Sequence, residues 1–222
     1  MKMKPELLIF DLDDTLYPPE SGLWHAIGDR INLYIQLRLG LTLTEAVALR
    51  DQMYHQYGTT LRGLQLHYRI SAEDYLAFVH DVPLNRYLKP DPHLRKILTS
   101  LPLRKVIFTN GDRSHANRVL NALQLDGCFE DIIDILDIAP YCKPMPQSFQ
   151  LALEKAGVQD FSRCVLFEDS NRNISSARTL GLFTVLVGKN GGPSEAHLQI
   201  PTIHEVISLF TPAFYLSNRS KK

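Results

Sequence analysis

The stretch LLIFDLDDTLYP, residues 7–18, sets three carboxylates directly behind four apolar residues. An apolar run of this kind predicts a buried strand, which we expect to end at Asp11. Asp13 and Asp14 then lie in the loop after the strand. Acidic residues often form turns, because their side chains accept hydrogen bonds from nearby backbone N–H groups. The rest of the chain decides whether these carboxylates build a turn or a reactive site.

The composition predicts a soluble globular protein with balanced charge. The chain has 222 residues, of which 45% are hydrophobic, and it can bury a sizeable core in one domain, with or without an insertion. Its 24 basic and 24 acidic residues give no general attraction to nucleic acid or to an anionic membrane, and we expect neither partner. An anionic ligand must therefore be bound by local groups.

Cysteine usage and the lack of long apolar runs suggest a location. The scattered Cys128, Cys142 and Cys164 are too few for a disulfide framework or a zinc site, and we expect them in the core of a reduced, intracellular protein. No apolar run approaches the roughly 20 residues of a membrane span, and the start MKMKPE lacks the apolar core of a signal peptide. We therefore expect a cytoplasmic protein.

Strand-like and helix-like patterns alternate along most of the chain, which is typical of βα units around a parallel sheet. The strand-like runs are continuously apolar, as in strands that are covered on both faces. We predict strands at 6–11, 104–109, 131–136, 163–168 and 182–187, and helices at 93–101, 114–123, 147–156 and 173–180. The predicted fold class is α/β, with a doubly wound parallel sheet.

One long segment breaks this alternation. Between Tyr17 and about Lys89 the chain shows only helical patterns, although an ordinary crossover between parallel strands needs a single helix. The segment 17–89 is therefore predicted to be an inserted all-helical domain. Residues 1–16 and 90–222 are predicted to form the α/β core.

Chemically active residues follow the predicted strands, at the edge where the loops of an open α/β sheet converge on a ligand. Beyond the acids of the first loop come Thr109-Asn110-Gly111, Lys143-Pro144 and Glu168-Asp169-Ser170. Each group taken singly suits a turn, a solvated charge or a helix cap. Together they are complementary, because clustered carboxylates repel unless they share a cation, and hard oxygen ligands suit Mg²⁺. With Mg²⁺ and a lysine, such a site suits a phosphate dianion.

The chain resembles the haloacid dehalogenase (HAD) superfamily of phosphotransferases in four ordered motifs: DLDDT (11–15), Thr-Asn-Gly (109–111), Lys-Pro (143–144) and EDSNRNISSARTLGL (168–182). The resemblance covers essentially the whole chain in order and spacing. It implies a Rossmann-like core, and the helical insert is similar to the superfamily's cap domain of the first type. Within the superfamily, DLDDTLYPPESGLW and the insert's YGTTLRGL (57–64) look most like the pyrimidine 5′-nucleotidase subgroup.

This resemblance, joined to the chemistry, implies a Mg²⁺-dependent phosphomonoester hydrolase. Asp11 is expected to attack phosphorus and form an aspartyl-phosphate. Asp13 is expected to protonate the leaving alkoxide and then to activate the water that cleaves the intermediate. The expected Mg²⁺ ligands are Asp11, the backbone carbonyl of Asp13 and Asp169. The residues expected to bind and stabilise the phosphoryl group are Thr109, Asn110, Gly111 and Lys143, and Thr109 and Lys143 are also expected to act in catalysis.

Other polar residues near these motifs are expected to support the site. Asp14 and Thr15 are interpreted as turn and support residues. Glu168 and Asn173 stand where the superfamily often carries groups that support the metal. The second of these is commonly an aspartate, so Asn173 leaves the number of acidic groups around the metal open.

The insert is expected to act as a lid that excludes water and selects the leaving group. Its candidate selector residues are Tyr57, Thr60, Arg62 and His67, since an aromatic ring can stack on a base while polar groups bind its edge. Tyr57 also suits the insert's own core, and Arg62 also suits a solvated helix face. The expected substrate is a pyrimidine nucleoside 5′-monophosphate such as UMP or CMP, and the expected state is a monomer or homodimer.

Other activities share parts of this pattern. A sugar-phosphate phosphatase or a phosphomutase would use the same acids under a different cap. A receiver-type phosphoacceptor module would also combine acids, Thr and Lys on a parallel sheet, but the long insert and the second acid, Asp13, argue against it. A metal-independent dehalogenase is disfavoured, because Asp13 and Asp169 supply groups that phosphoryl transfer uses.

Overall fold

The sheet at the centre of the fold is parallel. The computed structural model describes residues 5–188 and 194–210, and within these ranges six strands follow the order β3-β2-β1-β4-β5-β6. They are β1 (Leu7–Phe10), β2 (Arg104–Phe108), β3 (Asp131–Ile133), β4 (Cys164–Glu168), β5 (Phe183–Val187) and β6 (Leu198–Ile200). Strand β1 pairs with β2 on one side and with β4 on the other. The loops after these three strands therefore open at one edge of the sheet.

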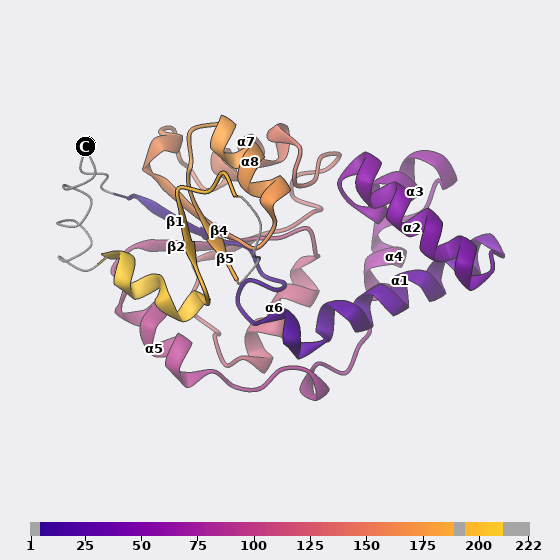
Figure 1. Cartoon of the computed structure of the whole chain (residues 1–222), viewed down its shortest axis with the longest axis horizontal. Coiled ribbons are helices and arrows are strands. Elements are labelled where there is room, and N and C mark those ends of the chain that lie inside the picture. Colours follow the sequence, from indigo (N-terminus) through magenta and orange to yellow (C-terminus); the bar gives the residue numbers. More distant parts are fainter. Residues whose placement is uncertain (1–4, 189–193, 211–222) are drawn as a thin grey trace.

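Helices cover both faces of the sheet, because alternate residues of a strand point to opposite sides. Leu8 and Phe10 of β1 pack in the hydrophobic cluster that includes α5, α6 and the 3₁₀ segment η4, whereas Leu7 and Ile9 pack in the cluster that includes α7 and α8. Figure 1 shows α7 and α8 above the sheet and α5 and α6 below it. The bounds are α5 (Pro92–Ser100), α6 (Arg113–Ala122), α7 (Pro146–Lys155), α8 (Asn171–Thr179) and η4 (Ile203–Phe210). The predicted α/β, doubly wound class is confirmed.

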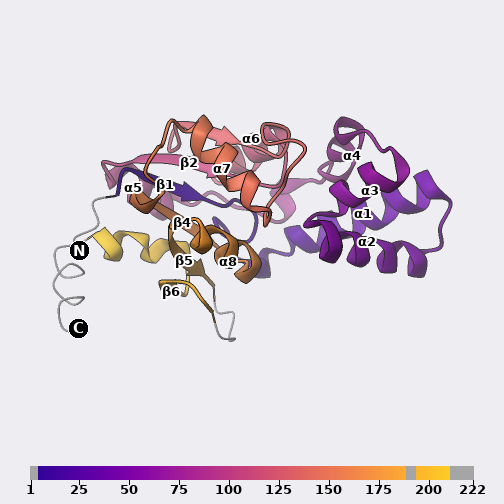
Figure 2. The ribbon, with the colours of Figure 1, turned by 90° about the horizontal axis from the view of Figure 1, so that it is seen from above.

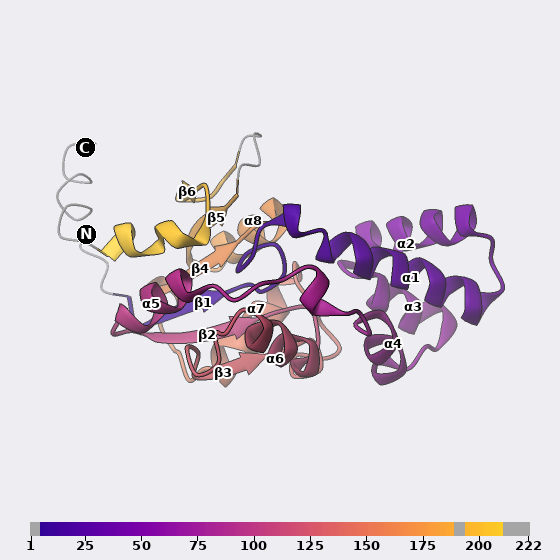
Figure 3. The same ribbon diagram turned by 90° about the horizontal axis from the view of Figure 1, so that it is seen from below.

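The helical insert stands between β1 and β2 in the chain and lies to one side of the sheet (Figure 1). Its helices are α1 (Leu23–Leu39), α2 (Leu43–Tyr57), α3 (Thr60–Tyr68) and α4 (Ala72–Val79), with short 3₁₀ turns η1 (Pro19–Ser21) and η2 (Leu84–Arg86) at the two junctions. Figures 2 and 3 show that the insert lies beyond the end of the sheet toward which β1 runs. Its status as a domain of its own stays a prediction.

Local sequence signals set the ends of the insert's helices. The Thr42 side chain accepts a hydrogen bond from the Glu45 N–H, and the Glu45 carboxylate accepts one from the Thr42 N–H, which is a capping box at the start of α2. Thr59 and Ser71 begin α3 and α4 in the same way, each accepting from a backbone N–H three residues on. Helix α1 ends at Leu39 and is followed by Gly40, whose left-handed φ of 70° suits glycine.

The sheet differs from the prediction at its edges. Strand β6 was not predicted, because its three residues are too short to show a periodic pattern and the strand is defined only by its pairing with β5. Strand β3 was predicted over 131–136 but ends at Ile133. The chain turns there because the Asp134 carboxylate accepts hydrogen bonds from the N–H groups of Leu136 and Asp137.

The structure shows the state of the cysteines and the character of the helices, both of which entered the predicted location. Cys128, Cys142 and Cys164 are free and buried, as predicted for core cysteines. Within residues 5–188 and 194–210, no helix combines the length and the apolar character needed to cross a membrane.

Helices α2 and α3 pack tightly at Gly63. A methyl group at this position would lie 2.6 Å from the Cβ of Met53 and 2.4 Å from its Sδ. Met53 is itself buried, with 4% of its surface exposed, so it has little room to move away. The pairing of these two helices therefore depends on the absence of a side chain at position 63.

Gly63→Ala is expected to lower the free energy of unfolding by about 1–3 kcal/mol, because the added methyl group overpacks α2 against α3. Gly28→Ala in α1 is the matched control, since a methyl group there meets the flexible end of Arg50, 3.2 Å away. The control is expected to match or exceed the wild type, because alanine favours a helix more than glycine does. Urea unfolding measures both, and equal stability of the two variants would contradict the packing argument.

Candidate active site

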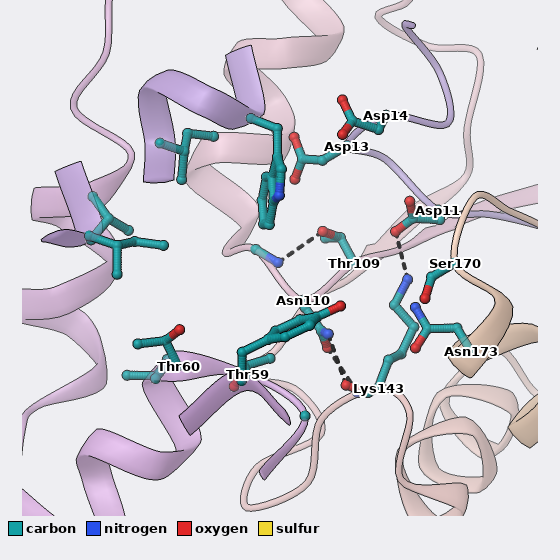
Figure 4. Close-up of a pocket in the computed structure, with 18 of the residues that line it drawn as sticks. Asp11, Asp13, Asp14, Thr59, Thr60, Thr109, Asn110, Lys143, Ser170 and Asn173 are labelled. Atoms are coloured by element: carbon teal, nitrogen blue, oxygen red, sulfur yellow. Dashed lines mark hydrogen bonds and ion pairs between the residues drawn. The ribbon is translucent and has the colours of Figure 1, made fainter. Parts of the chain in front are cut away.

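A cavity lies between the strand ends and the helical insert. The loops after β1, β2 and β4 contribute one wall, and residues of α1 to α4 contribute the other. Figure 4 shows Thr59 and Thr60 on the side of the insert and Asp11, Ser170 and Asn173 on the side of the sheet. The polar groups in the lining include Asp11, Asp13, Asp14, Thr109, Asn110, Lys143, Glu168, Asp169 and Asn173. The structure therefore brings together the residues expected to form the catalytic and metal site.

Hydrogen bonds from its backbone N–H and to both of its carboxylate oxygens hold Asp11 at the end of β1. Its backbone N–H donates to the Phe167 carbonyl at 2.9 Å, which continues the pairing of β1 with β4. Its Oδ1 accepts from Lys143 Nζ at 2.6 Å, and its Oδ2 accepts from Thr15 Oγ1 at 2.9 Å. Thr15 thus supports the Asp11 carboxylate. Asp14 adopts a left-handed φ of 60°, which is a turn conformation, and also lines the cavity.

Lys143 is a buried cation shared by several strand ends. Besides Asp11, its Nζ donates to Glu168 Oε2 and to the Phe108 carbonyl, both at 2.9 Å. Its side chain is only 1% exposed. Although burial lowers it, the neighbouring carboxylates of Asp11 and Glu168 hold the pKa of Lys143 above its usual value. All three N–H donors of the ammonium are therefore engaged, and Lys143 stays charged.

The carboxylates outnumber the ammonium in this part of the cavity. Burial and the charge of Glu168 raise the pKa of Asp11 to about 7, although Lys143 opposes the rise. Burial and the charges of Glu168 and Asp11 raise the pKa of Asp169 to about 10. Burial is the first cause of both shifts, and the second is negative charge that a single lysine does not neutralise. A further positive charge in the cavity would favour the ionised form of each group.

The donor set suits a divalent cation. Asp11, Glu168 and Asp169 each offer a carboxylate oxygen, and these oxygens all lie within 4.8 Å of one another. Hard oxygen donors of this kind suit Mg²⁺, and a dication would offset the charge that raises the two pKa values. Asp11 and Asp169 would hold the ion, with Glu168 beside them. The backbone carbonyl of Asp13 as a further ligand stays a prediction.

Asp13 has partners that the sequence analysis did not identify. Its Oδ1 accepts from Tyr17 Oη at 2.5 Å and pairs with His115 Nε2 at 2.8 Å. Although burial raises it, the charge of His115 and hydrogen bonds from His115 and Tyr17 lower the pKa of Asp13 to about 2. The available signal for His115 was its place in the first turn of α6, the helix that follows the Thr-Asn-Gly loop.

The loop after β2 is fixed by its own hydrogen bonds. Thr109 Oγ1 accepts from the Gly111 N–H at 2.9 Å. The Asn110 side chain forms a reciprocal pair with the backbone of Lys143: its Nδ2 donates to the carbonyl at 3.0 Å, and its Oδ1 accepts from the N–H at 2.9 Å. Figure 4 shows these contacts as dashed lines. Asn110 thus joins the loop of β2 to the loop that carries Lys143.

Of the candidate selector residues in the insert, Thr60 lines the cavity and three others do not. Helix α3 begins at Thr60 and buries the face formed by Thr60, Leu61 and Leu64, so Arg62 and His67 lie on other faces. The exposed His67 pairs through Nε2 with Tyr57 Oη at 2.5 Å. We therefore do not assign the leaving group to Tyr57, Arg62 or His67.

The aromatic wall of the cavity comes from other residues of the insert. Trp24 and Tyr54 line the cavity and expose 48% and 39% of their surface. The Arg172 guanidinium of α8 lies 4.9 Å from the centre of the Tyr54 ring and donates to the carbonyls of Tyr54 and His55 at 3.4 Å. These contacts hold the end of α2 against the core. The sequence pattern gave no sign of Tyr54, because its contact with Arg172 spans 118 positions.

Comparisons with known proteins agree with this arrangement. The model of the haloacid dehalogenase-like hydrolase family matches residues 5–181. Phosphate metabolism protein 8 of Saccharomyces cerevisiae is 29% identical over an alignment of 195 residues, and the match covers 82% of this chain. The match spans 61% of the length of that relative.

Solved structures share the fold. The HAD hydrolase YfnB of Bacillus subtilis, determined with bound magnesium, is 18% identical with a TM-score of 0.64, and the match covers 93% of this chain and 98% of that one. A HAD phosphatase of Thermococcus onnurineus is 21% identical with a TM-score of 0.62, covering 92% and 97%. At these identities the likeness shows the fold alone.

Mg²⁺ is expected to stabilise the fold through the cluster of Asp11, Glu168 and Asp169. At about 100 times its dissociation constant, a ligand adds about 2.7 kcal/mol to the free energy of unfolding. At about 2–4 °C per kcal/mol, this corresponds to a rise in Tm of about 5–11 °C. Asp169→Asn should remove most of the rise, whereas Glu154→Gln, an exposed acid of α7, should keep it. Calorimetry with and without Mg²⁺ measures the shifts; an undiminished rise in Asp169→Asn contradicts the ligand assignment.

Proposed function

Since the chain belongs to the haloacid dehalogenase-like hydrolase family, we propose that it hydrolyses phosphate monoesters with Mg²⁺ through an aspartyl-phosphate on Asp11. The observation that carries this proposal is the Asp11 carboxylate, which lies in the cavity, hydrogen-bonds the Lys143 ammonium, and shares a cluster with Glu168 and Asp169. The lysine favours the ionised form of the nucleophile and orients it. A bound Mg²⁺ supplies further positive charge beside the nucleophile and the phosphoryl oxygens.

The proposed reaction has two displacements at phosphorus. In the first, an Asp11 oxygen bonds to phosphorus as the bond to the leaving oxygen breaks, and Asp13 gives that oxygen a proton. In the second, Asp13 takes a proton from water, whose oxygen bonds to phosphorus and releases the Asp11 carboxylate. The pKa of Asp13 is lowered in the absence of substrate, and a phosphate dianion beside it would raise that pKa, because like charges disfavour the carboxylate. Asp13 can therefore acquire the proton that the first step uses.

Lys143 contributes mainly by holding carboxylates. Its donors already bind Asp11, Glu168 and the Phe108 carbonyl. A direct bond from Lys143 to phosphate stays a prediction, and it requires one of these contacts to open when substrate binds. Thr109 lies beside the same cavity and supports the proposal that the loop after β2 receives the phosphoryl oxygens.

Asp11→Asn is expected to keep the fold and to lower kcat by about 10⁴-fold or more, because an amide cannot form the phospho-enzyme. Asp14→Asn is the matched control. Asparagine tolerates the left-handed backbone of position 14, where φ is 60°, and the control should lose less than about tenfold. Steady-state hydrolysis of p-nitrophenyl phosphate with Mg²⁺, together with circular dichroism, measures both variants. Near-normal turnover of Asp11→Asn would contradict the proposed nucleophile.

For the substrate, we propose a pyrimidine nucleoside 5′-monophosphate such as UMP or CMP. Trp24 and Tyr54 offer partly exposed rings on the cavity wall, and a planar base can stack on such rings. Thr59 and Thr60 add hydroxyl groups that can bind the polar edge of a base. The resemblance of residues 57–64 to the pyrimidine 5′-nucleotidase subgroup supports the same substrate. A two-ring purine would have to displace packed side chains of the insert.

UMP and CMP are expected to have higher kcat/KM than AMP, GMP and hexose phosphates. Trp24→Ala should lower kcat/KM for UMP by about 5-fold to 150-fold, since a lost contact of about 1–3 kcal/mol scales at about 1.4 kcal/mol per tenfold. Tyr68→Ala is the matched control, an aromatic of the insert that is 42% exposed and does not line the cavity. Higher kcat/KM for sugar phosphates would favour the alternative phosphatase or phosphomutase and would leave the Asp11 chemistry in place.

A further inference from the structure

Two buried histidines, His115 and His80, are linked to Asp13 by contacts. His115 of α6 has a fully buried side chain, and its Nε2 lies 2.8 Å from Asp13 Oδ1. The ring of His80, which follows α4, stacks on His115 with 4.1 Å between ring centres and 13° between planes. His80 Nδ1 in turn lies 2.5 Å from Asp112 Oδ1. A line of contacts therefore runs from the insert through His80 and His115 to Asp13.

His115 uses only one of its ring nitrogens. Since the Asp13 carboxylate accepts hydrogen bonds, His115 Nε2 carries the proton of this contact and donates it. Its Nδ1 is buried and has no hydrogen-bond partner among the residues that the structure describes. An unpaired buried nitrogen destabilises the fold, so a histidine is not the most stable choice for this position. The feature that a histidine adds over an apolar ring is the donor to Asp13.

The two donors to Asp13 fix its orientation. Tyr17 Oη and His115 Nε2 both contact Oδ1: Tyr17 lies where the chain enters the insert, and His115 belongs to the core. The other oxygen, Oδ2, takes neither of these bonds. Rotation of the carboxylate would break both contacts, so Oδ2 is the oxygen that remains for the leaving group and for water.

The local backbone is shaped to admit the stacked rings. A methyl group on Gly111 would lie 3.2 Å from Cδ2 of His115 and 3.6 Å from Cε1 of His80. Arg118 of α6 donates to the carbonyls of His80 and Val82 at 2.7 and 2.6 Å, which holds the end of α4 against α6. The stack is therefore supported from both the core and the insert.

We propose that His115, held in place by His80, is a positioning residue that aims Asp13 Oδ2 at the leaving oxygen and then at water. This inference rests on the proposed function, because it assigns His115 a part in proton transfer by Asp13. Since His80 caps the end of α4 in the insert and Tyr17 lies where the chain enters the insert, Asp13 is aligned only while the insert is seated over the strand ends. Misalignment slows both proton transfers, and it leaves the attack of Asp11 on phosphorus unchanged only for an ester whose leaving group needs no proton.

The variants His115→Asn and His115→Gln separate this role from a structural one. The amide nitrogen of glutamine can occupy the place of Nε2 and donate to Asp13, whereas the shorter asparagine places its amide near Nδ1 and does not reach. His93→Asn, at an exposed position of α5 away from the cavity, is the control. Melting temperatures of all variants report on the fold.

Two substrates divide the reaction. The leaving group of p-nitrophenyl phosphate departs as an anion and needs no proton, whereas the alkoxide of an alkyl phosphate does. For His115→Asn we expect kcat/KM for an alkyl phosphate to fall about 100-fold, the usual effect of a misplaced group. For p-nitrophenyl phosphate, kcat/KM should change less than about threefold. Stopped flow should then show a burst of one equivalent of p-nitrophenolate, because hydrolysis of the aspartyl-phosphate still needs Asp13.

His115→Gln should restore kcat/KM for the alkyl ester to within about tenfold of the wild type. Equal losses with both esters, no burst, or equal activity of the Asn and Gln variants would overturn the inference. Unchanged kinetics in His115→Asn would also overturn it. A wild type that releases no phosphate from either ester would instead refute the proposed function, so the two failures are distinguishable.

Discussion

The buried ammonium of Lys143 is the interaction on which the rest of the site depends. It binds Asp11 after β1, Glu168 at the end of β4, and the carbonyl of Phe108 at the end of β2. Because β2, β1 and β4 are neighbours in the sheet, one cation ties together the three central strand ends. Removing one partner of a buried ion pair leaves an uncompensated charge, which typically costs about 3–5 kcal/mol. The sheet order therefore determines the position of the candidate nucleophile.

The same site holds more carboxylate groups than the Lys143 ammonium can neutralise. The raised pKa values of Asp11 and Asp169 have burial and the neighbouring Glu168 as their main causes. A dication would offset the excess charge of the carboxylates, and a phosphate group would in turn be bound by the dication and the lysine. We propose phosphoryl transfer for this reason. The insert closes on this cluster at Gly58, whose φ is 90° and where a methyl group would lie 3.0 Å from the Lys143 carbonyl. The close contact between Gly58 and Lys143 therefore links the position of the insert to the position of Lys143.

The sequence predicted the features that depend on local pattern and motif order. Apolar runs marked the strands that carry Asp11, Thr109 and Glu168, and the four motifs indicated which residues share the cavity. Contacts between distant segments could not be predicted from the sequence: Asp13 and His115 are 102 positions apart, and no periodicity links them. The selector prediction relied on residue types within 57–67, whereas the start of α3 at Thr60 decides which of these side chains can face the cavity.

The central claim is that Asp11 becomes covalently phosphorylated, and trapping that species tests it most directly. The enzyme, mixed with substrate and Mg²⁺, is quenched in acid within one turnover and digested for mass spectrometry. The account predicts one phosphoryl group on the peptide that contains Asp11, removed by hydroxylamine as expected for an acyl phosphate and absent from Asp11→Asn. Rapid turnover with no phosphorylated peptide, or with the phosphoryl group on another residue, would contradict it.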